Sequence, residues 1–235
     1  KILMKLPLLR KMNEAAWPLG IVFCALGVCL LTKAGFGLSM VSAAAYILHL
    51  KVVQYLPFFS QGMSEYVFQA VLLLVLCLAI QRFNWRYLLS FASAVVFGFV
   101  LDGWYLIFGS NAVYAVFWVR VLSFVLGELF TAIAIAFFFR TGWPLEIYEL
   151  FCTELARRYG WNMNRVKQCY DIAMLTLSVL LALILNHNLQ GLGAATVIIT
   201  VVNAPLITLF GKLLDKLFAF EPLLPILTGA LQICT

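Results

Sequence analysis

The sequence predicts an all-α polytopic membrane protein that contains two tandem repeats of opposite orientation. Three observations lead to this prediction. The composition is 64% hydrophobic and 11% charged, with a mean hydropathy of +1.02, whereas soluble domains carry about 25% charged residues. The apolar residues form segments long enough to cross a bilayer. A glycine-containing tract that follows a cation ends a long apolar segment in each half of the chain.

The two glycine-containing tracts have matching patterns. The first is Lys33-Ala34-Gly35-Phe36-Gly37-Leu38-Ser39, and the second is Arg140-Thr141-Gly142-Trp143-Pro144-Leu145-Glu146. Each copy therefore predicts an apolar helix, a cation, a break that glycine permits, and the start of a new helix. Paired breaks in corresponding halves indicate a transporter-like site between repeats. We expect one membrane domain over 1–235, with repeat one at 15–109, repeat two at 112–215 and an interfacial tail at 216–235.

Each copy is predicted to contain three membrane spans and one shorter helix. Residues 1–13 combine cations with apolar residues, as in a cytoplasmic interfacial segment. In the first copy the spans lie at 15–31, 64–80 and 87–108, with the shorter helix at 38–55. In the second copy they lie at 113–139, 166–185 and 192–213, with the connecting segment at 145–159.

The segment after the second break is too charged to cross lipid. It contains Glu146, Glu149, Glu154, Arg157 and Arg158, and each charge costs about 2.5–3.5 kcal/mol at the bilayer centre on insertion scales. If neither shorter helix crosses, each copy has three spans and the second copy is inverted. With cytoplasmic N- and C-termini, this arrangement places more Lys and Arg inside than the alternative of eight transmembrane helices.

Short motifs in both halves resemble one known family. They are Lys33-Ala34-x-x-Gly37-x-Ser39, Tyr170-Asp171, Gly191-Leu192-Gly193-Ala194-Ala195-Thr196 and Asn203-Ala204-Pro205. Over about residues 15–215 they are similar to the YczE/YyaS/YitT family of bacterial integral membrane proteins, especially its YczE-like branch. That family usually follows Gly-x-Ser with Pro and an acid, where this chain has Met40, Val41 and Ser42. The resemblance implies a transporter-like protein of the bacterial inner membrane and names no substrate.

Four ionisable residues within predicted spans are candidates for coupling or for structural ion pairs. Asp102 and Arg120 lie on either side of a short turn, so a structural pair and a substrate role both stay open. Glu128 has no cation one helical turn away, and it serves either proton coupling or a hydrogen bond to a neighbouring helix. Asp171 follows Lys167 by one turn, which suits a local pair or a helix cap, whereas the resemblance favours function.

The two breaks are the candidate substrate site. A new helix after each break presents unpaired N–H groups and partial positive charge, which attract anions. Alternatively, the breaks are interfacial turns whose cations contact lipid headgroups. Ser39 and Ser42 correspond to Glu146 and Glu149, so a ligand need not be bound symmetrically. The candidates for substrate binding are Lys33, Gly35, Gly37, Ser39, Arg140, Gly142, Glu146, Thr196 and Asn203.

These observations favour a secondary transporter or permease for a small polar or anionic solute, with proton coupling left open. The alternative is a non-transporting scaffold or regulatory protein. No catalytic motif or nucleotide-binding tract is recognisable, so an enzyme is not expected. The scattered cysteines lack metal-ligand spacing, so no metal or other cofactor is expected. The expected partners are the lipid bilayer and a small solute, with homo-oligomerisation open and no nucleic acid, because the cations lie at span ends.

Overall fold

The computed structural model describes residues 13–109, 113–141, 146–188 and 191–218. These residues form α-helices and one π-helical turn, and they contain no strand. The elements are α1 (Asn13–Ala34), α2 (Met40–Val52), α3 (Gln61–Ile80), α4 (Arg86–Phe108), α5 (Phe117–Thr141), α6 (Ile147–Tyr159), α7 (Met163–Leu181), the π-helix Ala182–Asn186 that continues α7, and α8 (Ala194–Leu217).

Six of the described helices are long and apolar enough to cross a membrane, which confirms the six predicted spans and indicates a multi-pass membrane protein. Helices α2 and α6 have 13 residues each. At 1.5 Å per residue, each is about 20 Å long, whereas the hydrocarbon core is about 30 Å thick. Neither α2 nor α6 is therefore long enough to be a seventh or eighth span. The six spans are Ala15–Ala34, Gln61–Ile80, Tyr87–Phe108, Phe117–Thr141, Arg165–Asn186 and Ala194–Leu217.

The observed helix ends differ from the predicted ends by a few residues. The span predicted at 113–139 begins at Phe117, and the span predicted at 192–213 continues through Leu217. Helix α8 therefore includes the start of the predicted tail, while residues 219–235 lie outside the described part of the chain.

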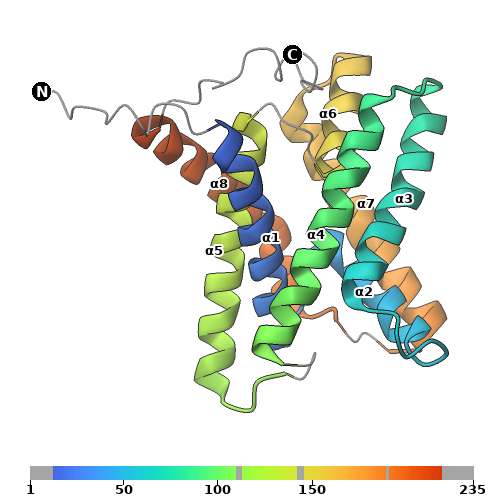
Figure 1. Cartoon of the computed structure of the whole chain (residues 1–235), viewed down its shortest axis with the longest axis vertical. Coiled ribbons are helices and arrows are strands. Elements are labelled where there is room, and N and C mark those ends of the chain that lie inside the picture. The colour runs from blue at the N-terminus through green and yellow to red at the C-terminus, as the bar shows by residue number, and fades with distance from the viewer. Residues whose placement is uncertain (1–12, 110–112, 142–145, 189–190, 219–235) are drawn as a thin grey trace, which may run out of the picture.

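Figure 1 shows α2 and α6 at opposite ends of the helix bundle. Helices α1 and α5 run side by side in opposite directions, and α4 lies against α1 as α8 lies against α5. Helix α2 contacts α3 and α7, and α6 contacts the same two helices. If α1–α4 are exchanged in order with α5–α8, each of these contacts is matched by another one. The α1–α4 contact then corresponds to α5–α8, α2–α3 to α6–α7, and α2–α7 to α6–α3.

Glycines bring α1 and α5 into close contact. A Cβ atom on Gly27 would lie 2.7 Å from the backbone oxygen of Gly127, and a Cβ atom on Gly127 would lie 3.0 Å from that of Gly27. Gly20, nearer the start of α1, faces the ring of Phe138. Small residues allow such close approach of helices inside a membrane, so this pair of spans forms a tightly packed centre.

The α3–α4 and α7–α8 pairs are packed differently. Helices α3 and α4 pack closely, and a Cβ atom on Gly62 would overlap the backbone oxygen of Gly98. Helices α7 and α8 make only a small contact. Beside them lies a groove of about 450 Å³, which is lined by Phe139, Arg140, Thr153, Met163, Lys167, Ala204, Ile207, Thr208 and Lys212.

Candidate functional site

The first break is a tight turn that packs against the start of α8. Gly35 and Gly37 have φ angles of 64° and 130°, which side chains rarely permit. A Cβ atom on Gly37 would overlap the Thr196 hydroxyl oxygen and approach the Gly193 backbone nitrogen. The Leu38 N–H donates a hydrogen bond to the Gly191 carbonyl over 3.1 Å. The glycines of the motif before α8 therefore make room for the first break.

Lys33 and Arg120 both lie at the first break. Lys33 is buried, with its ammonium 5.3 Å from the centre of the Tyr114 ring. Arg120 Nε donates to the Ala34 carbonyl over 2.8 Å, and the guanidinium lies 4.5 Å from the centre of the Phe36 ring. A cation at helix-terminal carbonyls complements the helix dipole. Arg120 thus caps the C-terminal end of α1.

Asp102 caps a different helix. Its carboxylate accepts hydrogen bonds from the Ser60 hydroxyl over 2.6 Å and from the Gly62 N–H over 2.9 Å. These contacts hold the N-terminus of α3 against α4. Since Arg120 is bound to α1 carbonyls instead, the ion pair considered between Asp102 and Arg120 is not formed.

Arg140 at the second break is engaged in a bidentate ion pair. Its Nε and Nη2 lie 2.6 and 2.8 Å from the two carboxylate oxygens of Asp215 on α8. The guanidinium lies over Gly211, where a Cβ atom would overlap it. Arg140 therefore joins the end of α5 to α8. The neighbouring candidate Gly142 lies outside the described residues.

The starts of α2 and α6 meet at one small cavity inside the bundle. Its volume is about 40 Å³, which is room for roughly one to three water-sized groups. Ser39 and Ser42 of the first break and Glu146 and Glu149 of the second all line it. The other lining residues are Cys24, Val28, Val41, Phe97, Thr131, Ile135, Tyr148, Lys167 and Asn203.

Ser39 and Glu146 occupy the same capping position but act differently. Ser39 Oγ accepts a hydrogen bond from the Ser42 N–H over 3.5 Å. Glu146 makes no side-chain cap, and the Ile147 N–H at the start of α6 donates to Gln69 of α3 instead. Glu146 is 3% exposed, and its Oε1 has no hydrogen-bond partner. Burial, and next the charge of Glu149, raise the pKa of Glu146 well above its ordinary value.

Lys167 of α7 is the cation of this cavity. Its ammonium lies 3.3 Å from Asp171 Oδ1 and 3.9 Å from Glu149 Oε1. Burial raises the pKa of Glu149, and the charge of Lys167 opposes that effect. Lys167 lines both the cavity and the groove beside α7 and α8. Asp171 therefore has the local ion pair that its spacing from Lys167 indicates.

Two of the polar candidates in α8 have separate roles. Asn203 lines the cavity, is 7% exposed, and has an Oδ1 atom without a hydrogen-bond partner. Thr196 does not line the cavity. Its hydroxyl accepts from the Gly193 N–H over 3.3 Å at the start of α8. Asn203 is thus available to a ligand, whereas Thr196 is a capping residue.

Glu128 is buried in α5 and does not line the cavity. Neither of its carboxylate oxygens has a hydrogen-bond partner. A carboxyl inside a span without such a partner is a candidate for proton coupling. The coupling role of Glu128 therefore stays a prediction.

Glu65, on α3, is a buried carboxyl near the site that the sequence analysis did not single out. Its Oε2 accepts a hydrogen bond from the Tyr148 hydroxyl over 2.9 Å, and Tyr148 lines the cavity. In the sequence, Glu65 is an acid near the predicted start of a span, where charges at the membrane interface are common. The structure places it instead within the helix bundle, where it is fully buried.

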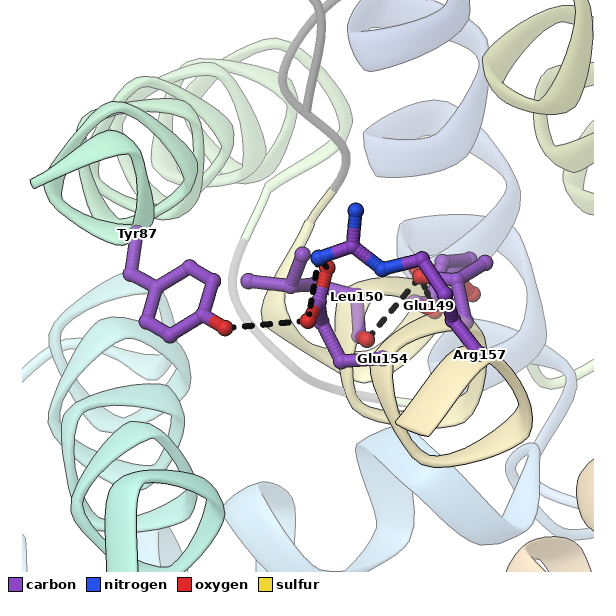
Figure 2. A network of polar contacts seen from close by, with 6 residues as sticks. Tyr87, Glu149, Leu150, Glu154 and Arg157 are labelled. Carbon is purple, nitrogen blue, oxygen red and sulfur yellow. Dashed lines mark hydrogen bonds and ion pairs between the residues drawn. The ribbon is translucent and has the colours of Figure 1, made fainter. Parts of the chain in front are cut away.

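A polar network holds α6 against α4 (Figure 2). The Tyr87 hydroxyl donates to Glu154 Oε2 over 3.0 Å, and Arg157 Nη2 lies 2.8 Å from Glu154 Oε1. Glu149 lies on the same helix and is labelled in the same view. The network thus fastens α6 to α4, and none of Tyr87, Glu154 and Arg157 lines the cavity.

The family model "Family of unknown function (DUF6198)" matches residues 12–212. The chain belongs to this family. Both breaks and every residue that lines the cavity lie within the range matched to DUF6198. No curated protein and no solved structure matches the chain. The DUF6198 match does not test the resemblance to the YczE/YyaS/YitT family, which stays a prediction. Across the described residues, no group of three or more His, Cys, Asp or Glu side chains is arranged to hold a metal ion.

Proposed function

We propose that the chain is a proton-coupled secondary transporter for a small polar solute, which binds in the cavity between the starts of α2 and α6. The observation that carries this proposal is a small cavity with charged and polar side chains in its lining, at the meeting point of two helices too short to span the membrane. Non-helical backbone at membrane depth is tolerated where it is buried in protein or lines a cavity. Transporters often bind solutes at such interrupted helices.

The proposed architecture is a pair of inverted repeats, α1–α4 and α5–α8. Its support is the exchange pattern of helix contacts and the placement of α2 and α6 at opposite ends of the bundle. We place both termini on the cytoplasmic side of a bacterial inner membrane, because that orientation puts most Lys and Arg inside.

The charges around the cavity favour a polar or cationic solute over an anionic one. Glu146 and Glu149 line the cavity together with one cation, Lys167, which also pairs with Asp171. The helix starts already have acceptors, since the Ser42 N–H bonds to Ser39 and the Ile147 N–H bonds to Gln69. An anion at this site would also meet the carboxyl groups of Glu146 and Glu149 in the cavity lining.

Proton coupling rests on Glu146 and Glu149. Burial raises the pKa of both carboxyl groups, which brings proton exchange closer to neutral pH. Lys167 lies 3.9 Å from Glu149, so a change in protonation of Glu149 changes the attraction between them. A solute in the cavity and a proton on Glu149 therefore interact with the same charged groups, which couples the binding of one to the binding of the other.

The test measures proton flux across the membrane of liposomes that contain the purified full chain and an internal pH indicator. A screen of small polar metabolites by thermal stabilisation selects the solutes, since a ligand that binds the folded state stabilises it. We expect an added solute to move protons, and Glu146→Gln to abolish that movement. Glu154→Gln is the matched control, because Glu154 is a buried carboxyl of the same helix that does not line the cavity. If no solute in the screen stabilises the protein or drives proton movement into the liposomes, the result would favour the scaffold alternative.

A further inference from the structure

The cavity wall contains hydrogen-bond acceptors that have no partner. Glu146 Oε1 and Asn203 Oδ1 both lie in side chains more than nine-tenths buried, and neither accepts a hydrogen bond. Both residues line the same cavity, although one precedes α6 and the other lies on α8. Buried polar atoms are nearly always hydrogen-bonded. Two unpartnered acceptors at one cavity therefore indicate a ligand that donates.

The remaining polar wall is also rich in acceptors. Glu149 supplies a second carboxylate, and Ser39, Ser42 and Thr131 supply hydroxyl oxygens. The Thr131 hydroxyl already donates to backbone carbonyls of its own helix. A donor with positive charge therefore finds several acceptors here, and hydrogen bonds to charged groups are the strongest ones in proteins.

The chain already places an ammonium group at the edge of this wall. Lys167 is an ammonium on a flexible stem, and its side chain is 12% exposed. It lies between Glu149 and Asp171 and lines both the cavity and the groove of about 450 Å³. An ammonium ligand that arrives through the groove meets the same kind of acceptors that now hold Lys167.

We propose that the central cavity binds an ammonium-type cation, as free ammonium or as the head of a small primary amine, between Glu146, Glu149 and Asn203. The ligand competes with the Lys167 ammonium for Glu149. The cavity volume of about 40 Å³ suits a group of this size, whereas a quaternary ammonium is larger and has no N–H to donate. This inference rests on the proposed function, since it names the substrate class of the same cavity.

The experiment measures thermal unfolding of the purified full chain in detergent at constant ionic strength. The probes are ammonium chloride and methylammonium chloride, with sodium chloride and tetramethylammonium chloride as controls. We expect the first two to raise the melting temperature and the controls to leave it unchanged. Equal stabilisation by tetramethylammonium would overturn the proposal, and so would a response to sodium alone, which would assign the cavity to a metal cation.

Two variants test whether the effect arises in the cavity. Glu146→Gln is expected to weaken the apparent affinity for methylammonium about tenfold or more, because a bound cation favours the ionised carboxylate and an amide cannot ionise. Glu154→Gln is expected to leave the affinity unchanged. Lys167→Ala, which removes the tethered ammonium, is expected to be less stable but to regain more stability from methylammonium than the unmodified chain. No difference in methylammonium affinity between Glu146→Gln and Glu154→Gln would contradict the assignment.

The binding result separates this inference from the proposed function. Stabilisation by methylammonium that depends on Glu146, without solute-driven proton flux in liposomes, would support the cation site and contradict transport. Proton flux driven by another solute, without any response to ammonium or methylammonium, would support transport and contradict the cation site.

Discussion

The α3–α4 pair and the α7–α8 pair occupy corresponding places in the two proposed repeats, yet they pack differently. In the first pair, Gly62 and Gly98 bring the backbones together, and Asp102 of α4 caps the start of α3. In the second pair, contact is small and a groove lies alongside. Glycine permits close helix packing and larger side chains prevent it. The difference teaches that one half forms a closed seam while the other leaves a groove, which Lys167 lines together with the cavity.

The two breaks differ in a related way. Ser39 caps α2 and is satisfied locally, whereas Glu146 leaves its helix uncapped and has a free carboxylate oxygen at the cavity. The first break also packs against the glycines before α8. We infer that the first half mainly closes the site and that the second half mainly supplies its chemistry.

The largest expected effect comes from breaking the closed seam. Gly62→Leu places a side chain where the Gly98 carbonyl and the Asp102 carboxylate already lie. Overpacking typically costs 1–3 kcal/mol, and because the Gly98 obstacle is backbone we expect a loss of about 3 kcal/mol in a thermal unfolding measurement. Gly103→Ala is the matched control, since its Cβ meets nothing within 4 Å. Equal melting temperatures for the two variants would mean that the seam does not hold the fold.

Filling the groove is expected to change transport more than stability. Thr208→Trp adds bulk to a residue that lines the groove and is exposed, so the unfolding free energy should change by less than about 0.5 kcal/mol. If solute passes here, the indole obstructs its path, and flux into liposomes should fall about tenfold or more, which corresponds to about 1.4 kcal/mol on the barrier. Leu209→Trp is the control, because Leu209 is exposed on α8 outside the groove. Undiminished flux in Thr208→Trp would remove the groove from the path.

A smaller loss of stability is expected from Asp102→Asn. The substitution keeps the shape but removes the charge that accepts from Ser60 and Gly62. Loss of a capping interaction typically costs about 1 kcal/mol, which a melting curve in detergent detects. Transport by the folded variant should persist, because Asp102 caps α3 and does not line the cavity. A folded variant without flux would instead give Asp102 a role in the substrate path.

The smallest expected effect is a change in the pH dependence of stability. Because the pKa of Glu146 is raised in the folded protein, the folded state binds more protons than the unfolded state above the ordinary Glu pKa of about 4.3. Stability therefore falls as pH rises through the window between the two values. Glu146→Gln should flatten this fall in melting temperature against pH, whereas Ser39→Ala should lower stability equally at every pH. An unchanged slope in Glu146→Gln would show that Glu146 is not the titrating group.

Local patterns were enough to predict the spans and the two shorter helices. The charges from Glu146 to Arg158 excluded a lipid crossing, and α6 is indeed too short to span. The same reasoning selected Ser39, Glu146 and Asn203, which all line the cavity. It was wrong to weigh Asp102 with Arg120 as a pair, since closeness in sequence across a turn does not determine which way side chains point.

The sequence by itself predicted a membrane protein with six spans and paired breaks, because the free energy of placing a segment in lipid depends on that segment's own residues. Only the tertiary structure decided that Glu146, Lys167 and Asn203 meet at one cavity and that Glu65 is buried beside it. Their meeting depends on how helices distant in the chain pack and rotate against each other. Glycine contacts such as Gly27 with Gly127 set that packing, and no local pattern specifies which glycine will face which.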